Sequence, residues 1–149
     1  MIGKTVGELK VGDQAFFSKT ITESDVSLFA GITGDFNPVH VNQTYAEKTV
    51  FKSRIAHGTL VAGLLSAVMA TQLPGPGAVY ISQELNFTAP VYIGDTVTAQ
   101  AEILFINLDA NRVNIKTTCV NQNGETVIDG IATVSPAKRR SREQEKKTV

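Results

Sequence analysis

Four segments in the second half of the chain alternate between apolar and polar positions. Alternation with a period of two predicts strands that bury one face. The expected strands are residues 79–88, 96–107, 112–121 and 126–135. One face of the second strand carries only apolar side chains, Val97, Ala99, Ala101, Ile103 and Phe105. Short stretches at 107–111 and 121–124 are expected to turn the strands into an antiparallel meander, and Asn123-Gly124 suits a type I′ turn.

The segment before these strands is apolar nearly all round. Residues 58–73 contain no charged side chain, and Pro74 ends the run. Such a pattern is typical of a buried helix, and the segment is shorter than the roughly 20 apolar residues that a membrane span needs. A sheet wrapped around this helix would bury both partners, so the predicted fold class is α+β with one long buried helix.

A strand and a helix are expected near the N-terminus. Residues 15–22 have the composition of a strand. Thr22 and Asp25 have the spacing of a capping box, in which the carboxylate reaches back to the start of a helix. The apolar face of this helix is formed by Val26, Phe29, Ala30 and Thr33.

The next segment is predicted to be a loop followed by a short helix. The helical pattern is interrupted by three residues, Gly31, Gly34 and Pro38. Residues 33–41 are therefore expected to form a loop. Asn42 suits the N-cap of a second helix over residues 43–48.

The composition is that of one globular domain without a net basic field. The chain has 149 residues, 42% of them hydrophobic, and 14 Lys and Arg residues balance 14 Asp and Glu residues. This balance argues against nucleic acid as a partner. The single cysteine, Cys119, excludes an intramolecular disulfide, and its surroundings lack the spacing of a zinc site.

The charges are unevenly distributed along the chain. Residues 138–149 contain six Lys or Arg residues and two Glu residues, a net charge of +4, so residues 1–137 carry −4. We expect a solvated tail outside a domain formed by residues 1–137. The N-terminus lacks the apolar run of a signal peptide, so the expected location is the cytoplasm, without a membrane partner.

The two histidines of the chain, His40 and His57, stand in settings that could carry chemistry. A turn around Asn37 and Pro38 could fold back and bring Asp35 next to His40. A carboxylate beside an imidazole is a competent acid–base pair. The alternative is structural: Asp35 caps a turn, and His40 is a half-buried residue with satisfied hydrogen bonds.

The dipeptide His57-Gly58 stands directly before the expected buried helix. Because glycine has no side chain, a ligand could approach the Gly58 N–H, and the helix dipole adds positive potential there. Such a donor suits a developing oxyanion. The alternative is that Gly58 eases helix packing and His57 helps to cap the helix. For Ser66, within the helix, the structural alternative is a bond to the carbonyl four residues earlier.

Residues 29–40, FAGITGDFNPVH, resemble the signature of the MaoC-like hydratase-2 family. Two further segments match the family pattern, RIAHG at 54–58 and PVYIGD at 90–95, and the resemblance covers residues 4–136 in order. Members of this family are (R)-specific enoyl-CoA hydratases. The resemblance implies a single hot-dog fold, with the 58–73 helix enclosed by a curved antiparallel sheet.

The resemblance also implies roles for individual residues. Asp35 and His40 would be the catalytic pair, and the Gly58 N–H would polarise a thioester carbonyl. The expected oxyanion and substrate-binding residues are Gly58, Ser66, Asn37 and Met69. Ser66 and Met69 enter this set because the acyl chain is expected to run along the helix that carries them.

The implied reaction is reversible hydration of a trans-2-enoyl-CoA to an (R)-3-hydroxyacyl-CoA of short or medium chain length. No metal or redox cofactor is expected, because coenzyme A is part of the substrate. A homodimer or higher homo-oligomer is expected, because pairing would close the exposed edge of the sheet. The alternatives are a hot-dog acyl-CoA thioesterase, which would cleave the same thioester, and a non-catalytic acyl-CoA-binding module.

Overall fold

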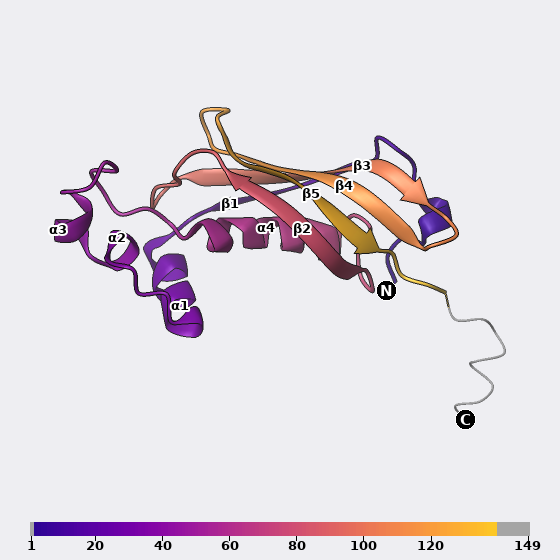
Figure 1. Ribbon diagram of the computed structural model, residues 1–149, viewed down its shortest axis with the longest axis horizontal. Coiled ribbons are helices and arrows are strands. Elements are labelled where there is room, and N and C mark those ends of the chain that lie inside the picture. The colour runs from indigo at the N-terminus through magenta and orange to yellow at the C-terminus, as the bar shows by residue number, and fades with distance from the viewer. Residues whose placement is uncertain (1, 140–149) are drawn as a thin grey trace, which may run out of the picture.

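A computed structural model describes residues 2–139 of the chain (Figure 1). Ala137 is buried, and Arg139 forms an ion pair with Glu8. The rest of the basic tail predicted at 138–149 lies outside the described residues. No helix within 2–139 is long and apolar enough to cross a membrane. The cytoplasmic location stays a prediction.

Five antiparallel strands form one sheet. They are β1 (Gln14–Thr20), β2 (Val79–Phe87), β3 (Thr96–Asn107), β4 (Arg112–Val120) and β5 (Thr126–Ser135). Their order in the sheet is β1-β3-β4-β5-β2, which places β1 and β2 at the two edges. The five strands predicted from the sequence are confirmed, with ends shifted by one or two residues.

The inward face of β3 is apolar, as predicted, except at its end. Val97, Ala99, Ala101 and Ile103 are fully buried. Phe105 was expected on the same face, but it is 57% exposed. The pairing of β3 with β4 shifts between Ile103 and Phe105, and an irregularity of this kind changes the face on which the next side chain lies.

Helix α4 (Gly58–Thr71) packs against the inner face of the sheet, as Figure 1 shows. Its buried residues form one face, Val61, Leu64, Leu65, Val68 and Met69. The opposite face carries small residues, including Gly63, Ser66 and Ala70, and is exposed in the single chain. The helix is therefore buried on one side only, although its sequence is apolar nearly all round.

Three further helices lie at one end of the sheet (Figure 1). They are α1 (Glu23–Thr33), α2 (Pro38–Val41) and α3 (Gln43–Ala46), and a single 3-10 turn, η1 (Val6–Glu8), precedes β1. The predicted capping box of α1 is present: the Asp25 N–H donates to Thr22, and the Thr22 N–H donates to Asp25. Asn42 caps α3 as predicted, accepting from the Tyr45 N–H at 3.0 Å.

The predicted loop at 33–41 is wrong in two respects. Helix α1 continues through Gly31 to Thr33 and ends only at Gly34, whose φ of 81° suits glycine. Residues 38–41 then form α2, because Pro38 stands at the first helical position and Asn37 caps the turn by accepting from the Val39 N–H. Proline starts this helix instead of preventing it.

The turn between β4 and β5 also differs from the prediction. A type I′ turn needs a positive φ at both central residues, but of this pair only Gly124 has one, at 76°. The Gly124 N–H donates to the Asn121 carbonyl, and the Asn121 side chain accepts from the Asn123 and Glu125 N–H groups. The side-chain oxygen of Asn121 thus fixes a longer turn.

Candidate active site

Asp35 lies in the short connection between α1 and α2, directly after the left-handed Gly34. One oxygen of its carboxylate, Oδ1, accepts a hydrogen bond from the Asn37 N–H at 3.2 Å. This local bond orients the side chain, and its Oδ2 atom has no hydrogen-bond partner among residues 2–139. Asp35 therefore acts as a turn cap through one oxygen and offers the other to a ligand.

His40 lies in α2, one turn after Asn37, and only 9% of it is exposed. Its Nδ1 lies 2.8 Å from the Ile55 carbonyl oxygen. A carbonyl can only accept, so Nδ1 carries the proton and Nε2 presents its lone pair. His40 is thus anchored through one nitrogen and can act as a base through the other.

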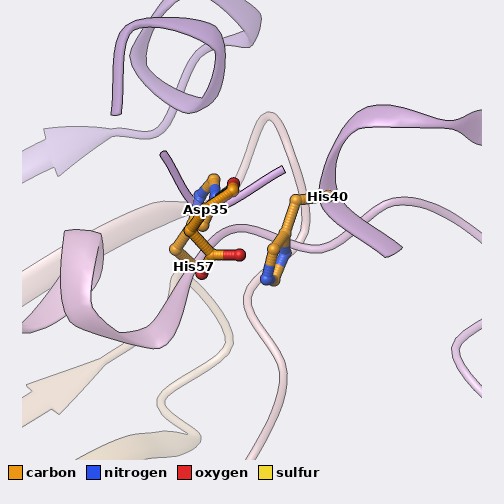
Figure 2. Close-up of side chains that lie close together, drawn as sticks. All are labelled: Asp35, His40 and His57. Atoms are coloured by element: carbon orange, nitrogen blue, oxygen red, sulfur yellow. Dashed lines mark hydrogen bonds between the residues drawn. The ribbon is translucent and has the colours of Figure 1, made fainter. Parts of the chain in front are cut away.

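The turn brings these side chains together with a second histidine, as Figure 2 shows. Polar side-chain atoms of Asp35, His40 and His57 all lie within 4.8 Å of one another. The rings of His40 and His57 stack with centroids 3.9 Å apart. A water that bridges two polar groups needs about 2.8 Å to each partner, so polar atoms within 4.8 Å of each other are close enough to share one.

A cavity of about 490 Å³ opens at this cluster. Its size is typical of small-molecule sites, and most of its wall is apolar. Its polar lining includes Asp35, His40 and His57, and Gly58 also lines it. The apolar wall is formed largely by Phe51, Ile55, Val61, Phe87, Val91 and Ile128.

Gly58 is the first residue of α4 and lines the cavity. Its N–H has no hydrogen-bond partner within residues 2–139, as is usual in the first turn of a helix. A Cβ atom at this position would lie 2.7 Å from the ring of Phe87. A larger residue here would therefore displace the Phe87 ring, whereas glycine leaves the ring in place and its free N–H can serve a ligand in the cavity.

The other predicted binding residues lie elsewhere. Asn37 caps α2 through its side chain. Met69 is 2% exposed within the core, Ser66 is exposed on the open face of α4, and neither lines the cavity of the single chain. Their proposed contacts with substrate stay predictions. His57 was noticed in the sequence but not assigned to the site, because its partners are distant in sequence.

The same three side chains are the one group within residues 2–139 with the make-up of a metal site. One nitrogen of each ring is already a donor, His40 Nδ1 to Ile55 and His57 Nε2 to the Asp35 carbonyl. Those nitrogens would have to give up their bonds to hold an ion. Cys119 lies apart in the core, where burial raises the pKa of its thiol to about 12.

Comparison with known proteins places the chain in a family. A family model described as "MaoC like domain" matches residues 10–125. The chain belongs to this MaoC-like family. An (R)-specific enoyl-CoA hydratase of Rhodospirillum rubrum is 54% identical over 127 residues, which cover 85% of this chain and 88% of the relative.

Two further proteins are similar to this chain. A 3-hydroxybutyryl-CoA dehydratase of Methylorubrum extorquens is 48% identical, over 89% of this chain and 83% of the relative. The solved structure of an unliganded R-hydratase from Pseudomonas aeruginosa superposes with a TM-score of 0.87 at 44% identity, covering 92% and 88% of the two chains. The predicted hot-dog fold is thereby confirmed.

Proposed function

We propose that this MaoC-like protein is an (R)-specific enoyl-CoA hydratase, which adds water reversibly to a trans-2-enoyl-CoA. The observation that carries the proposal is the way in which the Asp35 and His40 side chains are held. Each side chain is anchored through one atom and has a second polar atom free, and the two side chains bring polar atoms within 4.8 Å of each other. A carboxylate oxygen and an imidazole nitrogen at this separation can hold one water between them.

In the proposed reaction this water supplies every atom that is added. Its oxygen attacks C3 of the enoyl group while His40 Nε2 or the Asp35 carboxylate accepts a proton. A proton returned from the pair to C2 completes the hydration, so the enzyme is unchanged at the end of the turnover. Dehydration is the reverse sequence. A positioned acid–base pair of this kind contributes about 10²- to 10⁴-fold to a rate.

The Gly58 N–H is proposed to bind the thioester oxygen. Attack at C3 moves negative charge onto that oxygen, and a preorganised donor in an apolar cavity stabilises it. The N-terminus of the 14-residue α4 adds a favourable dipole. Cofactor chemistry is not required in this scheme, because acid, base and oxyanion donor all come from the chain and coenzyme A belongs to the substrate.

Short acyl chains are the proposed substrates. The cavity of about 490 Å³ is lined by Phe51, Phe87 and Ile128, and Met69 is not among its lining residues. One relative that is 48% identical is named for the four-carbon 3-hydroxybutyryl-CoA. Crotonyl-CoA is therefore the first substrate to test. Medium-length chains would need the space near Ser66 and Met69.

The functional unit is proposed to be a homodimer. Strand β2 lies at the edge of the sheet, and several of its apolar residues are exposed, including Val79, Ile81 and Phe87. An exposed apolar edge strand favours pairing with another chain. The open face of α4, with its small residues, is a second exposed surface that another copy could cover.

One assay separates hydration from thioester cleavage and from binding alone. Crotonyl-CoA is mixed with the protein, and loss of the enoyl-thioester absorbance and release of free thiol are followed together. Hydration removes the absorbance without releasing thiol. Thiol release at the same rate would indicate a thioesterase, and binding without either change would indicate a non-catalytic acyl-CoA-binding module.

A further inference from the structure

His57 is the most enclosed polar residue of the site. It is 0% exposed, and its ring lies between two others. The His40 ring lies 3.9 Å away at 32°, and the Phe29 ring lies 4.8 Å away at 51°. Such burial separates the His57 ring from bulk water, so any role of this side chain acts through the residues that it contacts.

The hydrogen bond of His57 reaches the backbone of Asp35. Its Nε2 lies 2.9 Å from the Asp35 carbonyl oxygen, so Nε2 is the protonated nitrogen and donates. Its Nδ1 has no hydrogen-bond partner in the described part of the chain. A buried polar atom without a partner costs free energy. Packing alone therefore does not explain why a histidine occupies this position.

The two contacts of His57 converge on the two members of the catalytic pair. The bond to the Asp35 carbonyl fixes the backbone that carries the carboxylate, in a connection that otherwise relies on short-range bonds to Thr33 and Asn37. The stacked ring sets the plane of His40, whose Nδ1 is held by the carbonyl two residues before His57. One side chain thus restrains both groups.

We propose that His57 is a positioning residue, which holds the Asp35 carboxylate and the His40 imidazole at the separation that one water can bridge. This inference rests on the proposed hydratase function. A displacement of about 1 Å in a reacting group can cost on the order of 100-fold in rate. Because the hydrogen bond of His57 goes to the Asp35 backbone and not to a ligand, its loss should lower kcat and leave KM nearly unchanged.

Two amide substitutions test the hydrogen bond. In His57→Gln the amide nitrogen can occupy the place of Nε2 and donate to the Asp35 carbonyl. In His57→Asn the side chain is too short for its amide nitrogen to reach that carbonyl. Both remove the ring and differ by one methylene, so they are a matched pair. We expect H57N to lower kcat about 10- to 100-fold and H57Q to recover several-fold of that loss. Equal kcat values for the two variants would overturn the assignment.

A double-mutant cycle with Asp35→Asn tests whether His57 acts through the pair. If it does, H57N costs several-fold less in kcat in the Asp35→Asn background than in the unmodified protein, because one of the two groups that His57 positions is already gone. The same 10- to 100-fold loss in both backgrounds would show that His57 only supports the fold. The control is Leu65→Ala in α4, which should lower the melting temperature but not the kcat of the folded protein.

Failure of this proposal can be told apart from failure of the proposed function. If the unmodified protein does not hydrate crotonyl-CoA, the hydratase assignment fails. If it does and H57N is as fast, only the role of His57 fails. Should the amide variants not fold, His57→Phe keeps a ring between Phe29 and His40 but has no donor. The double-mutant cycle is then run with H57F: a smaller kcat loss in the Asp35→Asn background supports the proposal, and an equal loss in both backgrounds contradicts it.

Discussion

The sheet with α4 and the segment 34–57 are built by different means. In the sheet, backbone ladders join five strands, and fully buried aliphatic residues such as Ile103 and Ile115 fill the space to α4. Segment 34–57 buries little beyond Ala46, Ala56 and its two histidines. Its shape is set by side chains that bond to nearby backbone groups, as Asp35, Asn37, Asn42 and Thr49 do.

The two regions therefore contribute differently: one mainly to stability, the other mainly to chemistry. Apolar burial contributes most of the free energy of folding, and it is concentrated in the sheet and α4. The polar groups that can act on a substrate lie mostly on the segment, where water and ligands reach them. Substitutions in the two regions should therefore change different observables.

The largest effect is expected for the catalytic pair. Asp35→Asn and His40→Ala should each lower kcat for crotonyl-CoA by about two to four orders of magnitude, because each removes an acid–base group. The melting temperature of Asp35→Asn should change little, since Asp35 is exposed and only local bonds are lost, whereas His40→Ala removes a buried ring and should lower it. The matched control is Asp109→Asn in the exposed turn before β4, which should keep full activity. Near-normal turnover of either variant would remove that residue from the mechanism.

The reverse result is expected in the sheet. Ile115 is fully buried on β4, and Ile115→Ala should lower the free energy of unfolding by about 2–5 kcal/mol. Urea unfolding measures this loss. The kcat of the remaining folded protein should stay within about twofold of normal, because the pair is held by bonds outside the sheet. A large loss of kcat in folded protein would show that the two regions are strongly coupled.

Gly58 joins the two regions and should give an intermediate effect. In Gly58→Ala, the new Cβ would lie 2.7 Å from the Phe87 ring, so the ring must move within the cavity wall. We expect kcat/KM to fall roughly tenfold, since the thioester oxygen and the N–H would no longer meet well. Gly63→Ala is the control, because a Cβ there meets nothing within 4 Å. Equal kcat/KM values for both variants would argue against the Gly58 contact.

The smallest effect is expected at the α1 capping box. The bond from the Thr22 N–H, followed by the ion pair with Lys19, lowers the pKa of Asp25 from its ordinary 3.8. The folded pKa lies below the unfolded one, so the stabilisation is present above pH 3.8 and lost as the pH falls through the folded value.

Asp25→Asn should therefore cost roughly 0.5 kcal/mol at pH 7, and the difference should shrink in strongly acidic solution. Urea unfolding of both proteins at several pH values measures it. Ser24→Ala, in the same exposed turn, is the control and should show no such pH dependence. If the stability difference between the two proteins grew as the pH fell, the predicted direction of the pH dependence would be wrong.

Much of the fold could be predicted from local patterns. Alternation fixed the strands, and the uncharged run with Pro74 fixed α4. The orientation of α4 could not be predicted, because small and aliphatic residues on all sides do not say which face meets the sheet. The exposure of Ser66 follows from that. The α2 helix was missed although Asn37-Pro38 is a cap followed by a first-turn proline.

The proximity of Asp35 and His40, the proposed catalytic pair, could be predicted, and the contacts that hold the pair in place could not. Asp35 and His40 are close in sequence, so one turn brings them together. The contacts of His57 join residues 22 and 17 positions apart, one of them through a backbone carbonyl that carries no sequence signal. Such contacts become visible only when the tertiary structure places α1, α2 and the start of α4 side by side.

The most direct test of the central claim is the stereochemistry of hydration. The unmodified protein is incubated with crotonyl-CoA, and the 3-hydroxybutyryl-CoA formed is resolved by chiral analysis. In the proposed mechanism Asp35 and His40 hold the water on one face of the bound enoyl group, so one enantiomer should form, and the account predicts the (R) product. The (S) product or a racemic mixture would contradict it.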